Sequence, residues 1–267
     1  MGDILIIYDY NKIVSNMSQR RVIVAYIKRN PLKQFLLSFI PRYVGNSVVL
    51  KIYNLAALIP VPLKIRIQNH DHNTAWLKKA KWDFLTVPSA YIENQNEWGE
   101  IQYGWGSHHN MKYSGCEIIA TFNALKALGK AGSSDFIADL IGEYEKHGAA
   151  LWGEFGVSPM AVCACLKRHG FVVVTAKKDN DESLNMADSQ SQVFIATVYN
   201  NAKDITAQIH TVCITKEENG YILHNAYCRN QAGVYAASSP YPTLKEAIAH
   251  ISGQEVKMIY LIGINLP

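Results

Sequence analysis

The feature that most constrains the fold is a single change of hydrophobic period near residue 170. Before it, apolar side chains recur at helical spacing in three segments: residues 116–128, 136–148 and 159–170. After it come five predicted strands: residues 171–176, 192–199, 208–215, 221–225 and 258–264. A capping box at Thr243 and Glu246 predicts a short helix before the last strand. Helices followed by strands predict an α+β domain in which a helical layer packs on an antiparallel sheet.

The cysteines favour free thiols over a disulfide framework or a zinc site. The chain has 267 residues, of which 49% are hydrophobic, enough for a buried core. Its five cysteines are unevenly spaced: Cys116, Cys163, Cys165, Cys213 and Cys228. An odd number does not pair completely, and one close pair does not make the two close pairs of a typical zinc site. We therefore expect no metal and no cofactor.

The first 100 residues differ in charge from the rest of the chain. Residues 1–70 hold ten Lys and Arg against two Asp, a net charge of +8, whereas residues 71–267 carry −4. We predict a basic, apolar extension over residues 1–100 and the α+β domain over residues 101–267. The extension either packs on the domain or contacts an anionic membrane surface peripherally, since Arg42 and Lys51 interrupt any spanning run. No nucleic-acid-binding module is recognised, so no nucleic-acid partner is expected.

The N-terminus does not read as a secretory signal. Asp3 and Asp9 stand where a signal peptide would be basic. We therefore expect a cytoplasmic protein, membrane-associated if the extension binds lipid. A reducing compartment suits a free reactive thiol.

Cys116 is the candidate nucleophile. It follows Ser114 and Gly115 and opens a predicted helix. The positive end of the helix dipole should lower the pKa of its thiol and favour the thiolate. The alternative is a buried structural cysteine.

His210 is the candidate general base, and Asn225 the residue that orients it. His210 lies in an alternating strand with Val212 and Ile214, and we expect it to face the helix start. The alternative is a core histidine bonded to a carbonyl. The Asn-Gly turn brings Asn225 within about two positions of facing His210. Its carboxamide oxygen could then accept from the imidazole and fix the tautomer. His224, pointed away by strand alternation, is the reserve candidate.

These residues resemble a known family. Asn110-Met-Lys-Tyr-Ser-Gly-Cys116-Glu-Ile-Ile-Ala is similar to the nucleophile motif of the bacteriocin-processing, double-glycine leader peptidases of the papain-like clan. Gly156-Val-Ser-Pro159, the strand beginning at His210 and the later Asn225 follow in the same order. The resemblance covers residues 105–264. It implies a papain-like cysteine protease fold and a Cys-His-Asn triad.

One position departs from the family. The family has glutamine six residues before the cysteine, where it donates to the oxyanion, and this chain has Asn110. Asparagine donates the same kind of hydrogen bond but is one methylene shorter. The alternative role for Asn110 is a loop cap.

Together these features predict a thiol-dependent acyl hydrolase, most simply a cysteine peptidase acting on a peptide or a small acyl substrate. One alternative is acyl transfer on the same triad. Another is a non-catalytic peptide-binding domain that kept the fold.

Overall fold

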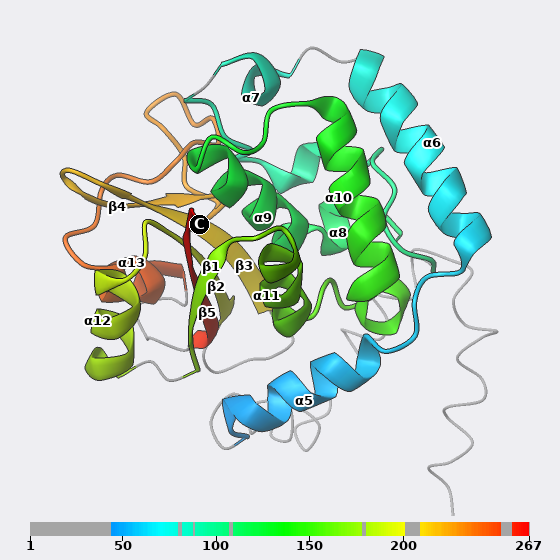
Figure 1. Ribbon diagram of the computed structural model, residues 1–267. Helices are drawn as coiled ribbons and strands as arrows, with labels where there is room; N and C mark the ends of the chain where they lie inside the picture. The colour runs from blue at the N-terminus through cyan, green and yellow to red at the C-terminus, as the bar shows by residue number, and fades with distance from the viewer. Residues whose placement is uncertain are drawn as a thin grey trace, which may run out of the picture.

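The computed structural model describes residues 44–79, 82–87, 89–106, 109–177, 180–200, 209–251 and 258–266. Their strands form one antiparallel sheet in the order β1-β5-β2-β3-β4. The strands are β1 (Val172–Ala176), β2 (Val193–Tyr199), β3 (Ile209–Glu217), β4 (Gly220–His224) and β5 (Met258–Asn265). The predicted α+β class and the five predicted strands are confirmed (Figure 1).

The β3–β4 hairpin turns at Glu218 and Asn219, the tip on which the predicted register depends. Glu217 pairs with Gly220, and Cys213 pairs with His224. Beyond this last pair, His210 is three residues from Cys213 and Asn225 is one residue from His224, an offset of two positions. The predicted offset between His210 and Asn225 is therefore confirmed.

Helices cover both faces of the sheet (Figure 1). On one face lie three of the predicted helices, α9 (Cys116–Ala127), α10 (Ser134–His147) and α11 (Pro159–Arg168). Ile195 and Cys213 point into the core beneath them. On the other face, α12 (Asp181–Ser189) and α13 (Leu244–Ile251) enclose a second core around Phe194, Val212 and Ile214. The sheet is thus the middle layer of three, where the sequence predicted one helical layer.

The described part of the predicted extension packs on the domain. Its elements are α5 (Asn46–Ala56), α6 (Leu63–Lys79), α7 (Asp83–Thr86) and the 3-10 turn η1 (Gln95–Glu97). Leu50, Leu77 and Trp98 are buried in the same core as α9. This agrees with the first of the two alternatives for the extension. Residues 1–43, with most of its basic side chains, lie outside the described residues, so the division at residue 100 stays a prediction.

Helix α6 buries polar side chains, so its sequence lacks the apolar periodicity by which a helix is predicted. Asn69 and Asn73 face inward, and their amides donate to the carbonyls of Gly104 at 3.0 Å and Gln102 at 2.8 Å. Figure 1 shows α6 lying along α10. Among the helices of the described ranges, none is both long and apolar enough to cross a membrane.

Candidate functional site

Cys116 is the first residue of α9, and its side chain is buried, with 8% exposed. The backbone N–H of Thr211, the residue after His210, donates to the thiol, which in turn bonds the carboxylate of Glu117. Burial, and then the negative charge of Glu117, raise the pKa of the thiol well above its usual value. The expected thiolate is therefore wrong for this arrangement, because desolvation outweighs the helix dipole. The resting thiol is neutral.

Glu117 belongs to the site, although sequence reasoning treated it only as part of the helix. Its carboxylate accepts from Val157 N and from Thr211 Oγ1, both at 3.3 Å. Burial raises its pKa to about 7. Gly156 adjoins it with a φ of 74°, and a Cβ there would lie 2.7 Å from Glu117 Oε2. The sequence did contain a signal for this role, because Glu117 is a charged residue that directly follows Cys116 within an apolar helix.

The ring of His210 is held neutral. His210 is 2% exposed, and its Nε2 donates to the backbone carbonyl of Asn225 at 2.7 Å. Burial lowers its pKa to about 4, although that hydrogen bond acts in the opposite direction. The proton on the neutral ring therefore sits on Nε2, and Nδ1 keeps its lone pair.

Asn225 orients His210 through its carbonyl, not through its carboxamide as predicted. The carboxamide is engaged by Gln95, whose N–H donates to Oδ1 at 3.1 Å and whose Oε1 accepts from Nδ2 at 3.2 Å. Asn225 has a φ of 59°, in the left-handed region that asparagine tolerates better than most residues. In this conformation the backbone carbonyl of Asn225 points at the imidazole of His210.

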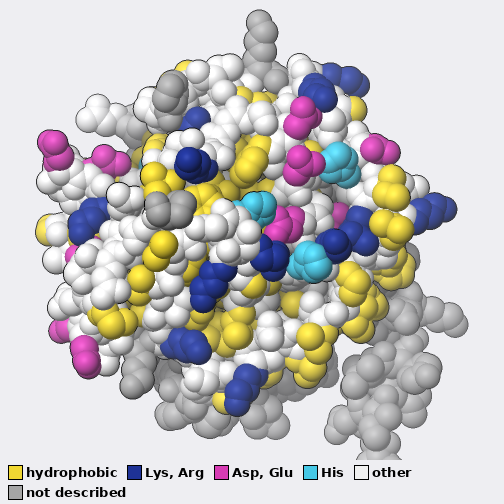
Figure 2. Space-filling view, in the orientation of Figure 1, with side chains coloured by type: hydrophobic (Ala, Val, Ile, Leu, Met, Phe, Trp, Pro, Cys, Tyr) yellow, Lys and Arg dark blue, Asp and Glu magenta, His cyan; other side chains and the backbone are white. Residues whose placement is uncertain are grey.

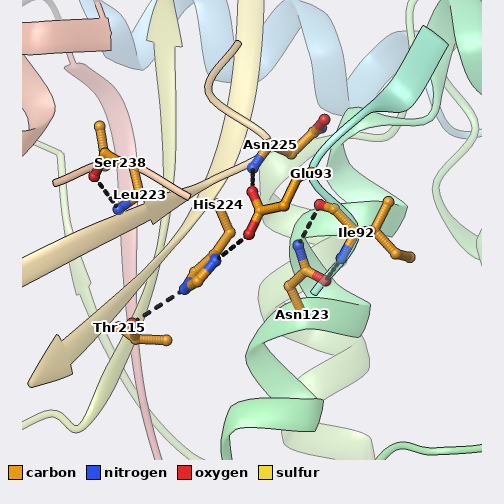
Figure 3. Close-up of polar contacts among 8 residues, drawn as sticks. All are labelled: Ile92, Glu93, Asn123, Thr215, Leu223, His224, Asn225 and Ser238. Atoms are coloured by element: carbon orange, nitrogen blue, oxygen red, sulfur yellow. Dashed lines mark hydrogen bonds and ion pairs between the residues drawn. The ribbon is translucent and has the colours of Figure 1, made fainter. Parts of the chain in front are cut away.

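A buried network holds Asn225 in place (Figure 3). Glu93 Oε2 accepts from the N–H of Asn225 at 2.8 Å, and Glu93 Oε1 bonds His224 Nδ1 at 2.7 Å. His224 Nε2 completes the network with Thr215 Oγ1 at 3.1 Å. The reserve histidine is thus engaged at both ring nitrogens. Glu93 and Gln95 lie in residues 89–113, a segment whose sequence lacks hydrophobic periodicity.

Tyr227 lies close to both His210 and Cys116. Its ring stacks on the imidazole of His210, with centroids 4.8 Å apart and planes 22° apart. Burial, and next the neighbouring Cys116, raise the pKa of Tyr227 to about 12. Within the described ranges, no hydrogen bond joins Cys116 to His210 directly. Cys116 and His210 therefore lie near the same tyrosine, but the described structure shows no hydrogen bond between them.

Asn110 takes the capping role that was the alternative to an oxyanion donor. It is the N-cap of α8 (Met111–Ser114), and its Oδ1 accepts from Tyr113 N at 3.1 Å. Its role towards an oxyanion stays a prediction. The backbone N–H of Cys116, the first residue of α9, has no carbonyl four residues earlier in that helix and is a candidate oxyanion donor.

A cavity of about 550 Å³ ends at Cys116. Its walls come from α5, from residues 150–156 and from Ile209 at the start of β3. Figure 2 shows hydrophobic side chains exposed over the lower part of the molecule, where Figure 1 places α5. The thiol is therefore reached through an apolar passage.

One cluster could in principle hold a metal ion. Glu143, Cys165 and His169 bring their ligand atoms within 4.8 Å of one another. However, Arg168 already bonds the carboxylate of Glu143 at 2.6 Å, and His169 bonds its other oxygen at 2.7 Å. The carboxylate is therefore satisfied without an ion.

Comparison of the chain with models of protein families, with curated proteins and with solved structures finds no match.

Proposed function

We propose that this protein is a thiol-dependent acyl hydrolase with a papain-like fold, in which Cys116 is the nucleophile and His210 the general base. The observation that carries the proposal is the buried, neutral imidazole, whose Nε2–H is fixed on Asn225 O while Nδ1 keeps a lone pair. A core histidine needs only a partner for its N–H. This one also lies beside a tyrosine that adjoins a helix-start cysteine.

The order of the helices and strands supports the resemblance to papain-like enzymes. The cysteine begins a buried helix that packs on an antiparallel sheet, the histidine lies near the start of β3, and the orienting residue follows the next strand. Asn225 then acts through its backbone, with Glu93 and Gln95 fixing its position.

The reaction proceeds in two balanced steps. His210 Nδ1 takes the proton of the Cys116 thiol as sulfur attacks the acyl carbon, and the leaving group departs with that proton. Water then gives a proton to His210, attacks the thioester and releases a carboxylic acid, which regenerates the thiol. Because the resting thiol is neutral, base and nucleophile must come together when substrate binds, as catalytic hydrogen bonds often do. The backbone N–H of Cys116 stabilises the oxyanion.

A peptide bond is the substrate that the family resemblance implies, and any activated acyl compound can report the same chemistry. Acyl transfer differs only in that an amine or alcohol replaces water in the second step. An amine added during turnover distinguishes the two by the amide it forms.

Capture of the acyl-enzyme tests the proposal. Incubation with a p-nitrophenyl ester, rapid acid quench and peptide mass mapping should locate the acyl group on Cys116. Cys163 is the internal control, because it is equally exposed at 8% and, among the described residues, no hydrogen bond joins it to a histidine. Acylation of Cys163 as readily as Cys116, or none at Cys116 during measured turnover, would mean that Cys116 is a structural thiol.

A further inference from the structure

The cavity above Cys116 has a chemistry that selects its ligand. At about 550 Å³ it falls within the range of small-molecule sites, roughly 300–1,000 Å³. Its rim is apolar and open to solvent, with Ile52 60% and Phe155 59% exposed. Its floor is buried, with Cys116 8% and Ser114 5% exposed. An apolar passage therefore leads from the surface to the thiol.

Polar groups able to meet a carbonyl are concentrated near that floor. Ser114 is one of the residues that line the cavity, and its Oγ is buried and has no hydrogen-bond partner within the described part of the chain. Ser114 is the last residue of α8 and lies two residues before Cys116, the first residue of α9. A buried hydroxyl without a partner is costly, and a bound carbonyl oxygen would satisfy it.

The walls contributed by α5 are the apolar residues Val48, Val49, Ile52 and Ala56 together with Tyr53. An extended peptide would bring an N–H and a C=O into this passage at every residue, and each would need a partner. A hydrocarbon chain needs none. The carboxylate of Glu117 at the floor also disfavours a ligand with a free carboxylate and favours a neutral ester, thioester or amide.

We propose that this cavity binds the aliphatic chain of an acyl substrate, placing its carbonyl at Cys116 beside the Ser114 hydroxyl. The proposal rests on the thiol chemistry proposed above and specifies its substrate class. Cys116 takes the acyl group from a neutral ester or thioester, whose alcohol or thiol leaves with the proton of the Cys116 thiol. Water then releases the acyl group from sulfur as a fatty acid and restores the thiol. The carboxylate product meets Glu117, which favours its departure.

A series of p-nitrophenyl esters from acetyl to decanoyl tests the inference. Each buried methylene contributes about 0.8 kcal/mol, so kcat/KM should rise about fourfold per methylene until the cavity is full. Ala56→Trp fills the wall and should move the optimum to shorter chains. Leu55→Trp is the matched control, because Leu55 is the adjacent residue on α5, is 69% exposed and lies outside the lining. Leu55→Trp should have the same optimal acyl-chain length as the unsubstituted protein.

The outcomes separate this inference from the proposed function. Turnover that needs Cys116 but is the same for every chain length, or equal effects of the two tryptophans, overturns the lipid-like substrate and leaves the thiol chemistry standing. If no ester acylates Cys116, the proposed function fails, and the cavity is tested alone. For that, alkyl methyl ketones are titrated calorimetrically into Cys116→Ser. Binding that tightens about fourfold per methylene and weakens in Cys116→Ser/Ala56→Trp supports the inference, and its absence refutes it.

Discussion

Replacing His210 with glutamine is expected to lower kcat on an activated ester by about 10²–10⁴, the usual contribution of a positioned general base. Glutamine can still donate to the carbonyl of Asn225, so the packing around β3 should persist. It offers no basic nitrogen at the position of Nδ1, so the neutral thiol of Cys116 keeps its proton. KM should change little, because the acyl chain does not rely on the imidazole. Steady-state kinetics at matched folded fraction, checked by circular dichroism, measure the effect.

His224→Gln is the matched control for that substitution. His224 is 3% exposed against 2% for His210, and it lies on the neighbouring strand. Its ring bonds Glu93 and Thr215, and Glu93 would still hold the N–H of Asn225 without it. We expect kcat to stay within about tenfold of the natural value, because His224 would affect the reaction only through the position of Asn225. If His224→Gln costs as much as His210→Gln, then His224 carries the base function and His210 is a core histidine.

Glu117→Gln is expected to change both the pH dependence of stability and the reactivity of Cys116. Burial raises the Glu117 pKa from 4.5 to about 7. The protonated carboxyl therefore stabilises the fold below pH 4.5, and this stability is lost as the pH rises to about 7. Glutamine cannot ionise, so the variant should gain on the order of 3 kcal/mol relative to the natural chain across that window. Urea denaturation at pH 4.5, 6 and 7.5 measures this.

The thiol should become more reactive in the same variant. Removing the negative charge of Glu117 lowers the pKa of Cys116, so alkylation at pH 8 should be faster. Glu145→Gln separates the two effects, since burial raises the Glu145 pKa to about 7 as well, while its carboxylate bonds Asn69 and Gly104. It should reproduce the stability trend and leave Cys116 alkylation unchanged. Slower alkylation in Glu117→Gln would instead identify Glu117 as the base.

The elements of the domain were predictable because their patterns are local. The start of α9 at Cys116 and the β3–β4 hairpin follow from apolar periodicity and an Asn-Gly turn. The hairpin also fixed the offset between His210 and Asn225. These features depend on spacing along the chain, which a sequence displays directly.

The polar contacts of the site depend on backbone direction, which spacing does not show. Asn225 was expected to use its carboxamide, but its left-handed backbone presents the carbonyl to His210. The pKa of Cys116 was expected to fall at the helix start, but burial and Glu117 raise it. Glu93 lies in a segment without hydrophobic periodicity. Its role is visible only in the structure, where its carboxylate bonds His224 and Asn225 at the end of β4.

The protonation state of His210 decides whether this histidine can act as the base for Cys116. Nitrogen-15 NMR of the histidine-labelled protein, with the His210 signals assigned by their loss in His210→Gln, reports the charge and tautomer of the ring. We expect a neutral ring at pH 6 with its proton on Nε2, titrating at about pH 4, because burial opposes the imidazolium and Asn225 O holds the N–H. A ring that titrates near its ordinary pKa, or one that carries its proton on Nδ1, would leave Cys116 without its proposed base.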